Sequence, residues 1–409
     1  MMSDSVSSAS GSVPLPEGWR MVTFGEVARN VNINEKEPLK HGITRAVGLE
    51  HLDPCSLRIT RWGEITDEIS FTRRFSKGQI LFGKRRAYQR KAALAEFDGI
   101  CSSDILVFEA RSDVLIPELL PFIVQSDRFF EFAINTSSGS LSPRTKWKDL
   151  AAYTFPLPPI DEQCRIAEIL WAAEDVIVKN EAFVAEVEHY KQLMMRDLFR
   201  KGIGHEEFQE IERIGMVARG WKSSQLKEVV SITNGQVDPK VMPYKSMIHI
   251  GPEDIESRTG RIISLRTNED LKISSGNYYF DEHDILYSKI RPYLVKVAFP
   301  HHSGTCSADI YPLKPDKQKI NPDYLFQYLL SQVFTTQAIS FQNRTGMPKI
   351  NREEFGIITV PLPPLPEQRQ IAAILSSIDD TIAAAKASVE ASKALKIRLI
   401  NEFLSSKRE

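Results

Sequence analysis

The chain has 409 residues, more than one ordinary domain holds, so two or three domains are expected. A hydrophobic share of 42% and a charged share of 26% are typical of globular domains, and no apolar run reaches the length of a membrane span. The formal net charge of −1 neither indicates nor excludes a nucleic-acid partner, because local clusters of charge decide that affinity.

The chain begins with a Ser-rich stretch, residues 1–16, which lacks the apolar core of a signal peptide and is expected to be a disordered tail. A first globular segment, 17–155, follows it. Short runs such as GQILFG (78–83) and SSDILVF (102–108) have the composition of strands. The run PELLPFIVQSDRFFEFAI (117–134) has helical character. This segment is therefore predicted to be a mixed α/β domain.

Residues 156–202 open with Pro-Leu-Pro-Pro and continue as one long predicted helix. The prolines are poor helix formers but fix an extended lead-in, and acidic residues in the next turn suit the helix dipole. Apolar residues then recur every three or four positions, which is typical of a coiled-coil seam. They are Ile166, Leu170, Ala173, Ile177, Val184, Val187, Tyr190, Met194 and Leu198.

The second half of the chain repeats this order. After a linker at 203–217 come a second globular segment, 218–360, and a second hinge and helix, 361–409. The second helix has its own apolar series: Ile371, Leu375, Ile378, Ile382, Ala385, Val389, Leu395, Leu399 and Phe403. A proline-rich peptide ligand is the alternative interpretation of PLPP. Its recurrence before both helices favours a structural hinge.

The repeat is visible residue by residue at an offset of 205. Between 79–108 and 284–313, twelve of thirty aligned pairs are identical, and between 156–170 and 361–375 ten of fifteen are. Neither helix can bury its apolar stripe alone, so the two are expected to pair. The predicted fold is α+β, with two mixed α/β domains joined by two long helices that form an antiparallel coiled coil, related by a pseudo-twofold duplication.

Enzymatic motifs are incomplete. GQILFGKR (78–85) approaches a phosphate-binding loop but has Arg85 where the Mg²⁺-binding hydroxyl belongs, and it is interpreted as a strand that ends in a charged loop. The eight histidines form no metal-binding pattern, and no metal site is expected. Asp104 and Asp309 are expected to cap turns. Cys101 and Cys306 are expected to pack as small buried side chains, and the four cysteines form no disulfide framework, which favours a reducing cytoplasm.

Basic residues around a tyrosine recur in both halves. KRRAYQRK (84–91) contains five Lys or Arg in eight residues, and its counterpart is KIRPYLVK (289–296). Lys and Arg suit phosphates, Arg also suits guanine, and Tyr can bond a phosphate or pack on a base. A solvated basic face is the alternative, but its preservation in both halves favours nucleic acid. The candidates are Lys84, Arg85, Arg86, Tyr88, Arg90, Lys91, Lys289, Arg291, Tyr293 and Lys296.

A second loop in each half is rich in Ser, Thr, Gly, Gln and Asn. It occupies 136–148 in the first half and 342–351 in the second. Small hydroxyl and amide groups can position a nucleic-acid backbone and read base edges. The candidates here are Ser140, Arg144, Lys146, Arg344, Thr345 and Lys349. Differences between the halves, such as Arg85 against Ile290 and Arg90 against Val295, predict two readers of different half-sites.

The motif PLPPxxEQxxIAxIL, present twice after divergent globular segments that contain CSSDILVF and CSADIYPL, resembles the specificity subunits of type I restriction-modification enzymes. The resemblance extends from Trp19 to about Phe403. It implies a non-catalytic subunit with two target-recognition domains, each of which reads one part of a bipartite DNA sequence. It also implies helices that set the spacing and bind the modification subunits. The residues expected at the interface with a partner subunit or between the helices are Glu162, Gln163, Ile166, Leu170, Glu367, Gln368, Ile371 and Leu375.

The expected partners are double-stranded DNA, two methyltransferase (modification) subunits and restriction subunits, in the cytoplasm. S-adenosylmethionine, and ATP with Mg²⁺ for cleavage, are expected on those partners and no cofactor on this chain. Three alternatives stay open. A type IIB-like specificity subunit would differ in its neighbouring reading frames. A coiled-coil scaffold with two protein-binding globules would not bind DNA in a salt-dependent way. An ATP-using enzyme would bind nucleotide through Lys84.

Overall fold

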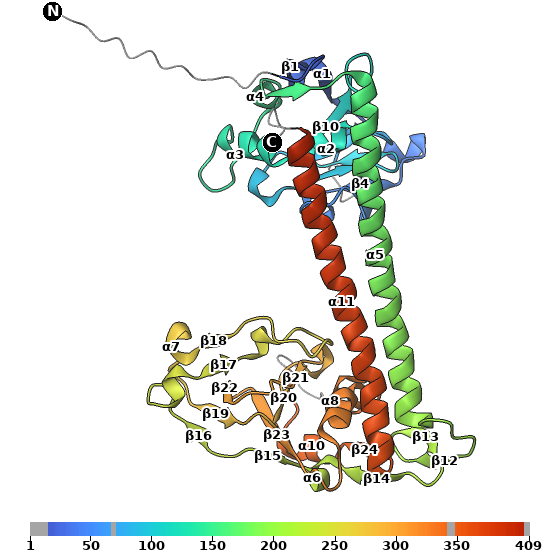
Figure 1. Cartoon of the computed structure of the whole chain (residues 1–409), viewed down its shortest axis with the longest axis vertical. Helices are drawn as coiled ribbons and strands as arrows, with labels where there is room; N and C mark the ends of the chain where they lie inside the picture. Colours follow the sequence, from blue (N-terminus) through green and yellow to red (C-terminus); the bar gives the residue numbers. More distant parts are fainter. Residues whose placement is uncertain (1–14, 67–70, 342–347, 405–409) are drawn as a thin grey trace, which may run out of the picture. The chain divides into compact units, whose positions relative to one another are not determined.

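The computed structural model describes residues 15–66, 71–341 and 348–404 (Figure 1). Most of the expected tail, residues 1–14, lies outside them. The chain divides into two compact units: unit 1 contains the chain up to Glu181 together with the stretch from Ala387, and unit 2 runs from Ala182 to Lys386. Each unit therefore combines one globular segment with part of each long helix.

The described residues of unit 1 form three sheets. A four-stranded antiparallel sheet has the order β2 (Ala28–Val31), β10 (Ile105–Ala110), β7 (Ile80–Gly83), β8 (Ala92–Leu94). A five-stranded sheet has the order β3 (Ile33–Asn34), β6 (Arg73–Phe75), β9 (Gly99–Cys101), β4 (Arg45–Val47), β5 (Gly63–Glu64). In it β4 and β9 are parallel and the other neighbours antiparallel. β1 (Arg20–Thr23) pairs with β11 (Thr154–Leu157), so the start of the segment lies beside the strand that leads into the first hinge.

Unit 2 repeats this arrangement strand for strand. Its four-stranded sheet has the order β15 (Val230–Ile232), β23 (Ile310–Pro315), β20 (Ile285–Ser288), β21 (Val297–Ala298). Its five-stranded sheet has the order β16 (Gln236–Val237), β19 (Asn277–Phe280), β22 (Gly304–Cys306), β17 (Ile248–Ile250), β18 (Arg266–Thr267), and only β17 and β22 are parallel. β14 (Lys222–Gln225) pairs with β24 (Thr359–Leu362). The duplication found in the sequence is thus also one of topology.

Short helices complete each unit. Those of unit 1 are α1 (Phe24–Val27), α2 (Leu120–Gln125), α3 (Asp127–Asn135) and α4 (Trp147–Leu150). Those of unit 2 are α6 (Leu226–Val229), α7 (Asn268–Leu271), α8 (Pro322–Leu330), α9 (Gln332–Ser340) and α10 (Arg352–Gly356). The helical run expected at 117–134 is broken at Ser126, whose hydroxyl donates to the Ile123 carbonyl and accepts from the Phe129 amide as the N-cap of α3. Ser331 makes the equivalent break between α8 and α9.

Two long helices follow the hinges, as expected: α5 (Ile160–Lys201, 42 residues) and α11 (Leu365–Phe403, 39 residues). In unit 1, Glu174 of α5 pairs with Lys396 of α11 at 2.7 Å, and Glu181 pairs with Lys393 at 2.9 Å. In unit 2, Lys191 pairs with Asp379 at 2.6 Å and Glu188 with Lys386 at 2.7 Å. Since later residues of α5 meet earlier residues of α11, the two helices are antiparallel in each unit.

The seam residues nearest the hinges do more than pair the two helices. Ile166 and Leu170 are fully buried in the same cluster as the globular residues Phe122 and Phe155 and the α11 residue Ile400. Their duplicates Ile371 and Leu375 lie in the equivalent core of unit 2. The apolar stripe therefore attaches each helix to its own globular segment as well as to the other helix.

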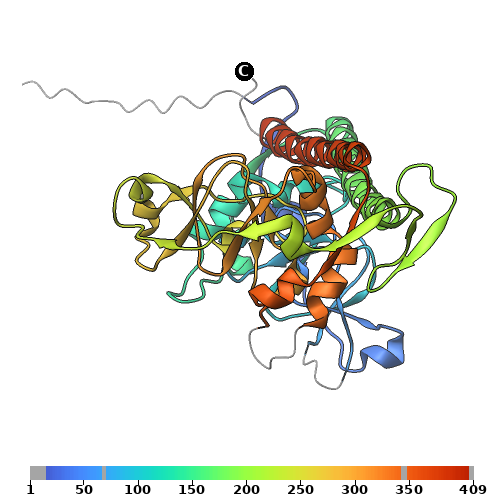
Figure 2. The same cartoon turned by 90° about the horizontal axis from the view of Figure 1, so that it is seen from below.

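The segment 203–217 is not the plain linker expected from the sequence. β12 (Phe208–Ile211) and β13 (Gly215–Ala218) form an antiparallel hairpin after α5 (Figures 1 and 2). Arg213 and Gly215 adopt positive φ angles in the turn that joins the strands. Both strands are short and most of their residues are at least partly exposed. The hydrophobic pattern that would predict a strand is therefore weak in this part of the sequence.

Cys101 and Cys306 are fully buried, which confirms their expected role as packed side chains. Burial raises the pKa of the Cys101 thiol to about 12, while Cys55 and Cys164 are exposed. Within the described ranges, no helix is both long and apolar enough to cross a membrane.

Candidate nucleic-acid interface

In each unit the basic segment (84–91 or 289–296) lies beside described residues of the second loop (136–148 or 342–351), although the sequence predicted them separately. In unit 1 the Arg86 amide donates to the Pro143 carbonyl at 2.8 Å, and the Thr145 amide donates to the Lys84 carbonyl at 3.0 Å. In unit 2 the duplicates do the same: Arg291 to Pro348 at 2.8 Å, and Ile350 to Lys289 at 3.0 Å. The described candidates of both loops therefore belong to one site in each unit.

A strained turn presents the tyrosine of each site. In unit 1 a single 3₁₀ turn, Ala87–Gln89, lies between Arg86 and Arg90, which have φ angles of 54° and 53°. The turn Pro292–Leu294 of unit 2 lies between Arg291 and Val295, at 48° and 50°. Left-handed conformations are costly for residues other than glycine, above all for β-branched valine. Their retention in both copies indicates that this turn shape is required.

The turn holds its tyrosine toward solvent. Tyr88 is 55% exposed and Tyr293 is 41% exposed, and each is the middle residue of its turn. Arg291, Ser140, Lys146 and Lys349 are also exposed. Tyr88, Ser140 and Lys146 thus give unit 1 an exposed ring, hydroxyl and cation, and Tyr293, Arg291 and Lys349 give unit 2 an exposed ring and two cations, which are groups that suit nucleic-acid contacts.

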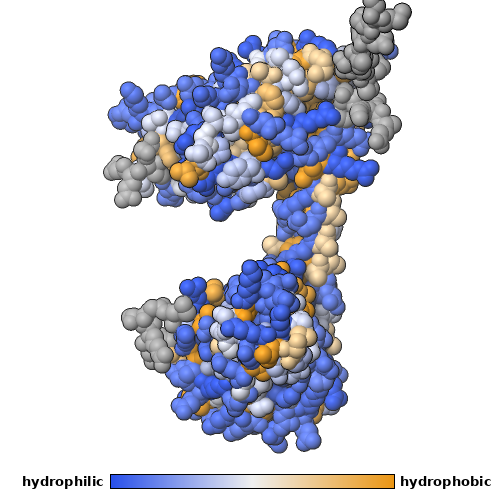
Figure 3. Space-filling view, turned by 90° about the vertical axis from the view of Figure 1, so that its left-hand side faces the viewer, coloured by the Kyte–Doolittle hydropathy of each residue, from blue (hydrophilic) through white to orange (hydrophobic). Residues whose placement is uncertain are grey.

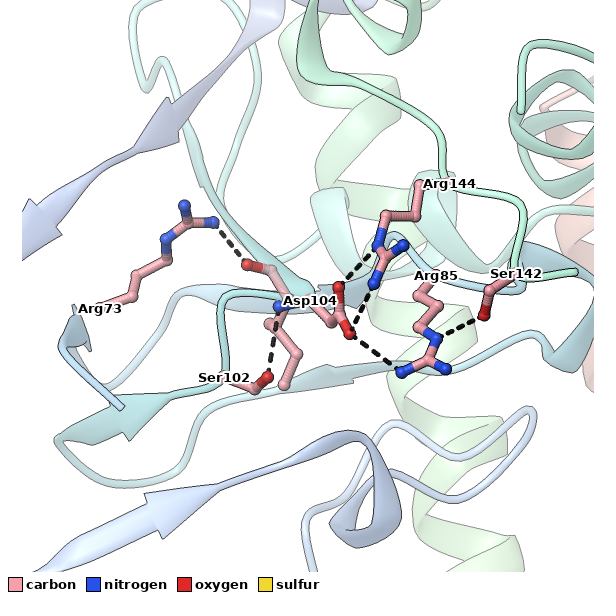
Figure 4. Close-up of polar contacts among 7 residues, drawn as sticks. Arg73, Arg85, Ser102, Asp104, Ser142 and Arg144 are labelled. Carbon is pink, nitrogen blue, oxygen red and sulfur yellow. Dashed lines mark hydrogen bonds and ion pairs between the residues drawn. The ribbon is translucent and has the colours of Figure 1, made fainter. Parts of the chain in front are cut away.

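An aspartate that was expected to cap a turn lies at the centre of the unit 1 site (Figure 4). The Asp104 carboxylate accepts from Nε of Arg144 at 2.9 Å and from Nη1 of Arg85 at 3.4 Å. Arg85 also donates through Nε to the Ser142 hydroxyl at 2.6 Å. The turn is closed instead by Ser102, whose hydroxyl accepts from the Asp104 amide at 3.2 Å. The capping role assigned to Asp104 was therefore wrong, because Ser102 fills it.

The charges of this cluster affect one another. Burial disfavours the ionised Asp104, but hydrogen bonds and positive charge from Arg144 and Arg85 outweigh it and lower the pKa of the carboxyl group. The pKa of Lys84 is lowered chiefly by its partial burial and also by the nearby Arg73 and Arg144, against the opposing effect of Asp104. Asp104 is therefore ionised at neutral pH between several cations.

Unit 2 contains the same cluster with different side chains. Asp309 lies 3.8 Å from the ammonium group of Lys289 and 3.7 Å from that of Lys349. Its amide also donates to a serine hydroxyl, that of Ser307, at 3.2 Å, so the capping role assigned to Asp309 was wrong for the same reason. Ile290 occupies the position of Arg85, so this carboxylate faces two lysines in place of two arginines.

Some of the expected contact residues are held by the fold. Arg90 pairs with Asp127 at 2.6 Å and lies over the Phe130 ring, and its duplicate Val295 is 2% exposed. Arg90 thus ties its turn to α3, whereas Val295 is buried in the core of unit 2. Lys91 donates to the Leu49 carbonyl at 2.6 Å, and Lys296 donates to that of Pro252. DNA contact by Arg90, Lys91 and Lys296 stays a prediction, and the structure shows that each of these side chains also contacts another part of its own unit.

Arg344 and Thr345 lie outside the described residues. Arg86 is half-buried, and its Nε has no hydrogen-bond partner among the described residues. Lys289 donates to the Ala308 carbonyl at 2.7 Å. Sequence reasoning did not assign Ser142 or Leu141 to the site. Leu141, at the tip of the unit 1 loop, is 91% exposed, and an isolated leucine in a Ser-rich loop was the available signal.

The EQ pair of the hinge motif has an internal role. Gln163 and Gln368 are each 1% exposed. Gln163 accepts from the Ile116 amide at 3.0 Å and donates to the carbonyls of Val114 and Pro158 at 3.1 and 3.0 Å. Gln368 makes the duplicate set: it accepts from Asn321 at 2.7 Å and donates to Lys319 and Pro363 at 3.3 and 2.9 Å. The two glutamines fasten each hinge to its own globular segment.

The remaining hinge candidates are also engaged within the chain. Ile166, Leu170, Ile371 and Leu375 are buried and so have no exposed surface for a partner subunit. Glu162 pairs with Arg165 at 2.7 Å. Glu367 accepts from Nε1 of Trp221 at 3.1 Å, from the Ile203 amide at 3.1 Å and lies 2.9 Å from Nε2 of His205. Glu367 thus ties the second hinge to Trp221 and to the segment after α5, whereas Glu162 pairs with a residue of its own helix.

The exposed face seen in Figure 3 is mostly hydrophilic on both units, with small scattered apolar patches. In the parts of the chain that the structure describes, no group of three His, Cys, Asp or Glu side chains could hold a metal ion. What the sites offer chemically is binding: cations, an exposed ring and small hydroxyl groups around a partly buried carboxylate.

Comparison with known proteins places both halves in one family. The model of the "Type I restriction modification DNA specificity domain" matches residues 16–188 and again 218–391. The chain is 30% identical to the EcoDI specificity subunit of Escherichia coli over 57% of this chain and 56% of that protein, which is less than two thirds of its length. It is 26% identical to a putative specificity subunit, MjaX, of Methanocaldococcus jannaschii, over 96% of this chain and 94% of that protein.

A similar fold is present in a solved structure concerned with complex assembly and conformational transition of the type I R-M system. The match has a TM-score of 0.60 and 22% identity, and it covers 96% of this chain and 99% of that chain. At this identity the likeness concerns the fold, and it extends over both units.

Proposed function

This chain belongs to the family of type I restriction modification DNA specificity proteins, and we propose that each of its units reads one half of a bipartite DNA target. The observation that carries the proposal is the recurrence of one site in two copies. Each unit contains the same strained turn, the same pair of loop-to-loop hydrogen bonds and an exposed tyrosine among cations. The differing side chains, Arg85 and Arg144 against Ile290 and Lys349, supply different half-site preferences.

In this proposal the chain is a non-catalytic subunit that acts on chromosomal DNA in the cytoplasm. Two modification subunits methylate the target, and restriction subunits join them for cleavage. S-adenosylmethionine, and ATP with Mg²⁺, belong to those partners. The long helices set the spacing between the half-sites and bind the modification subunits.

A surface of α5 within unit 2 supports partner binding there. Phe183, Tyr190 and Leu193 are 48%, 51% and 40% exposed and lie at helical spacings of seven and three residues. Leu193 borders a groove of about 970 Å³ whose walls include Val333 and Ile382. Phe183 and Tyr190 do not line this groove, but an exposed apolar stripe on a helix is typical of a protein-binding surface. They are better candidates for contact with a modification subunit than the buried hinge residues.

DNA binding by the full-length chain tests the proposal directly. We expect affinity for a duplex of mixed sequence to fall steeply as salt rises, by about 0.9 logarithmic units per tenfold salt for each phosphate contacted. Arg291→Ala is expected to weaken binding to all sequences and to reduce the salt slope by about 1, because an exposed cation of the site is lost. Fluorescence anisotropy at several salt concentrations measures both quantities.

Arg29→Ala is the matched control. Arg29 is an arginine whose side chain is 64% exposed, outside the site, and it pairs with Glu109. Its loss is expected to leave the slope unchanged. Binding that does not depend on salt would favour the alternative of a coiled-coil protein scaffold, and nucleotide binding abolished by Lys84→Ala would favour an ATP-using enzyme.

A further inference from the structure

We propose that Asp104 is the positioning residue of the unit 1 reader, holding the Arg144 guanidinium so that its free edge meets a guanine of the target. The inference rests on the proposed DNA-reading function and assigns the base class that this half-site must contain. It follows from which edges of the guanidinium are already occupied, from the burial of the carboxylate and from the contrast with unit 2.

The guanidinium of Arg144 is held from one side. Its Nε donates to one oxygen of Asp104 at 2.9 Å, and its Nη2 faces the other oxygen at 3.5 Å. An arginine fork has five N–H groups, and this contact uses the edge formed by Nε and Nη2. No described residue hydrogen-bonds to the end edge, formed by Nη1 and the second N–H of Nη2. That edge fits the O6 and N7 acceptors of guanine in the major groove.

The carboxylate that orients this arginine is itself fixed. The Asp104 side chain is 18% exposed, whereas that of Arg144 is 47% exposed. The Asp104 backbone carbonyl accepts from the Lys84 amide at 3.0 Å, and its amide is bound to Ser102. A second arginine, Arg85, reaches the same carboxylate and is bound to Ser142 on its other side (Figure 4). Asp104 therefore fixes the direction of Arg144 and leaves its far end in solvent.

An aspartate has a cost at a DNA surface, because it repels phosphate and neutralises part of the local positive charge. A site selected for affinity alone would do better without it. Its presence at the centre of the cations is explained if orientation matters more than charge. A pre-positioned guanidinium loses less conformational freedom when it binds a base, and it discriminates between bases by geometry.

Unit 2 provides an internal comparison. Lys349 stands in the place of Arg144, and its ammonium lies 3.7 Å from Asp309. An ammonium group is a point charge without a planar fork, so it has no free edge for a carboxylate to orient. Asp104 is thus expected to support base selection in unit 1, whereas its duplicate Asp309 is expected to contribute only charge in unit 2.

The test uses the full-length chain and a pool of duplexes with randomised positions, from which bound sequences are recovered and sequenced. Wild type is expected to enrich a sequence with a guanine in the half-site read by unit 1. Asp104→Ala is expected to lower the preference for that guanine by roughly ten- to a hundredfold, the range of a bidentate arginine contact, with the other half-site unchanged. Binding to the unselected pool is expected to stay equal or tighten, with a salt slope steeper by about 1.

Two variants serve as references. Glu109→Gln removes the same charge from unit 1 at the Arg29 pair and is expected to alter no base preference. Asp309→Ala is expected to tighten pool binding without changing the base read by unit 2. If Asp104→Ala does not fold, Asp104→Asn makes the same comparison, because it removes the charge and one acceptor while keeping the shape.

The outcomes are distinct. Retention of the guanine preference in Asp104→Ala, or in Asp104→Asn where that variant is needed, would overturn the positioning role. A parallel loss of selected and unselected binding would also overturn it, because that pattern indicates a structural role alone. If wild type enriches no sequence from the pool, the proposed DNA-reading function itself is wrong.

Discussion

Lys396→Met is expected to lower the free energy of unfolding by about 3–5 kcal/mol, because it leaves a buried carboxylate without its partner. Lys396 and Glu174 form a 2.7 Å ion pair between α11 and α5, and their side chains are 4% and 5% exposed. Methionine fits the space of the lysine stem, so the loss reports the unpaired charge of Glu174. Chemical denaturation followed by circular dichroism measures it.

The duplicate pair and an exposed pair calibrate this result. Lys191→Met is expected to cost less, because its partner Asp379 is 33% exposed and also accepts from Gln327 at 2.8 Å. Lys393→Met, at the exposed pair with Glu181, is expected to cost under about 1 kcal/mol. Replacing both Lys396 and Glu174 with methionine is expected to recover most of the stability. Equal costs at Lys396 and Lys393 would contradict the importance of burial.

Gln163→Ala is expected to destabilise unit 1 by about 2–5 kcal/mol, because three backbone groups lose at once the buried side chain that pairs with them. They are the amide of Ile116 and the carbonyls of Val114 and Pro158. Gln368→Ala is expected to destabilise unit 2 in the same way, because the duplicate backbone groups lose their hydrogen-bond partner. Urea denaturation of each variant measures the loss.

The matched control is Gln192→Ala, an exposed glutamine on α5, for which a change within about 0.5 kcal/mol is expected. DNA affinity at low denaturant gives a second measurement, because Gln163 does not touch the candidate interface. If Gln163→Ala left stability unchanged but abolished partner binding, the glutamine would belong to a subunit interface and not to the hinge.

The large features of this fold could be predicted because the chain states them twice. Strands such as β7 and β20, the hinges and the two long helices were all expected, since hydrophobic period and proline position are local properties. The pairing of the helices followed from two unpaired apolar stripes, and their antiparallel direction was implied by the family resemblance. The repeat also marked both basic loops correctly as belonging to equivalent places.

Features that depend on contacts distant in the sequence could not be predicted. Asp104 lies 40 residues from Arg144, and nothing in the order of residues indicates that they meet. The hinge glutamines were assigned to an interface with a partner subunit or between the helices, because a repeated polar residue has no local sign that it is buried against its own globular segment. The break at Ser126 was missed because the apolar spacing continues across it, and its capping hydrogen bonds become evident only in the structure.

The site also separates what is shared by the two copies from what differs. Both copies have the turn with its left-handed residues, the exposed tyrosine and the central aspartate. The copies differ in the side chains around that aspartate, which are arginines in unit 1 and lysines in unit 2. A common frame with exchanged contact residues is what two readers of unlike half-sites require.

The central claim is that the two units read separate halves of one DNA target, and exchange of one unit's globular segment tests it most directly. Residues 20–150 are replaced with the corresponding segment of another member of the family, and genomic methylation is sequenced in a host that supplies the modification subunits. The account predicts that one half of the methylated sequence changes and the other half stays the same. A change in both halves, or in neither, would contradict it.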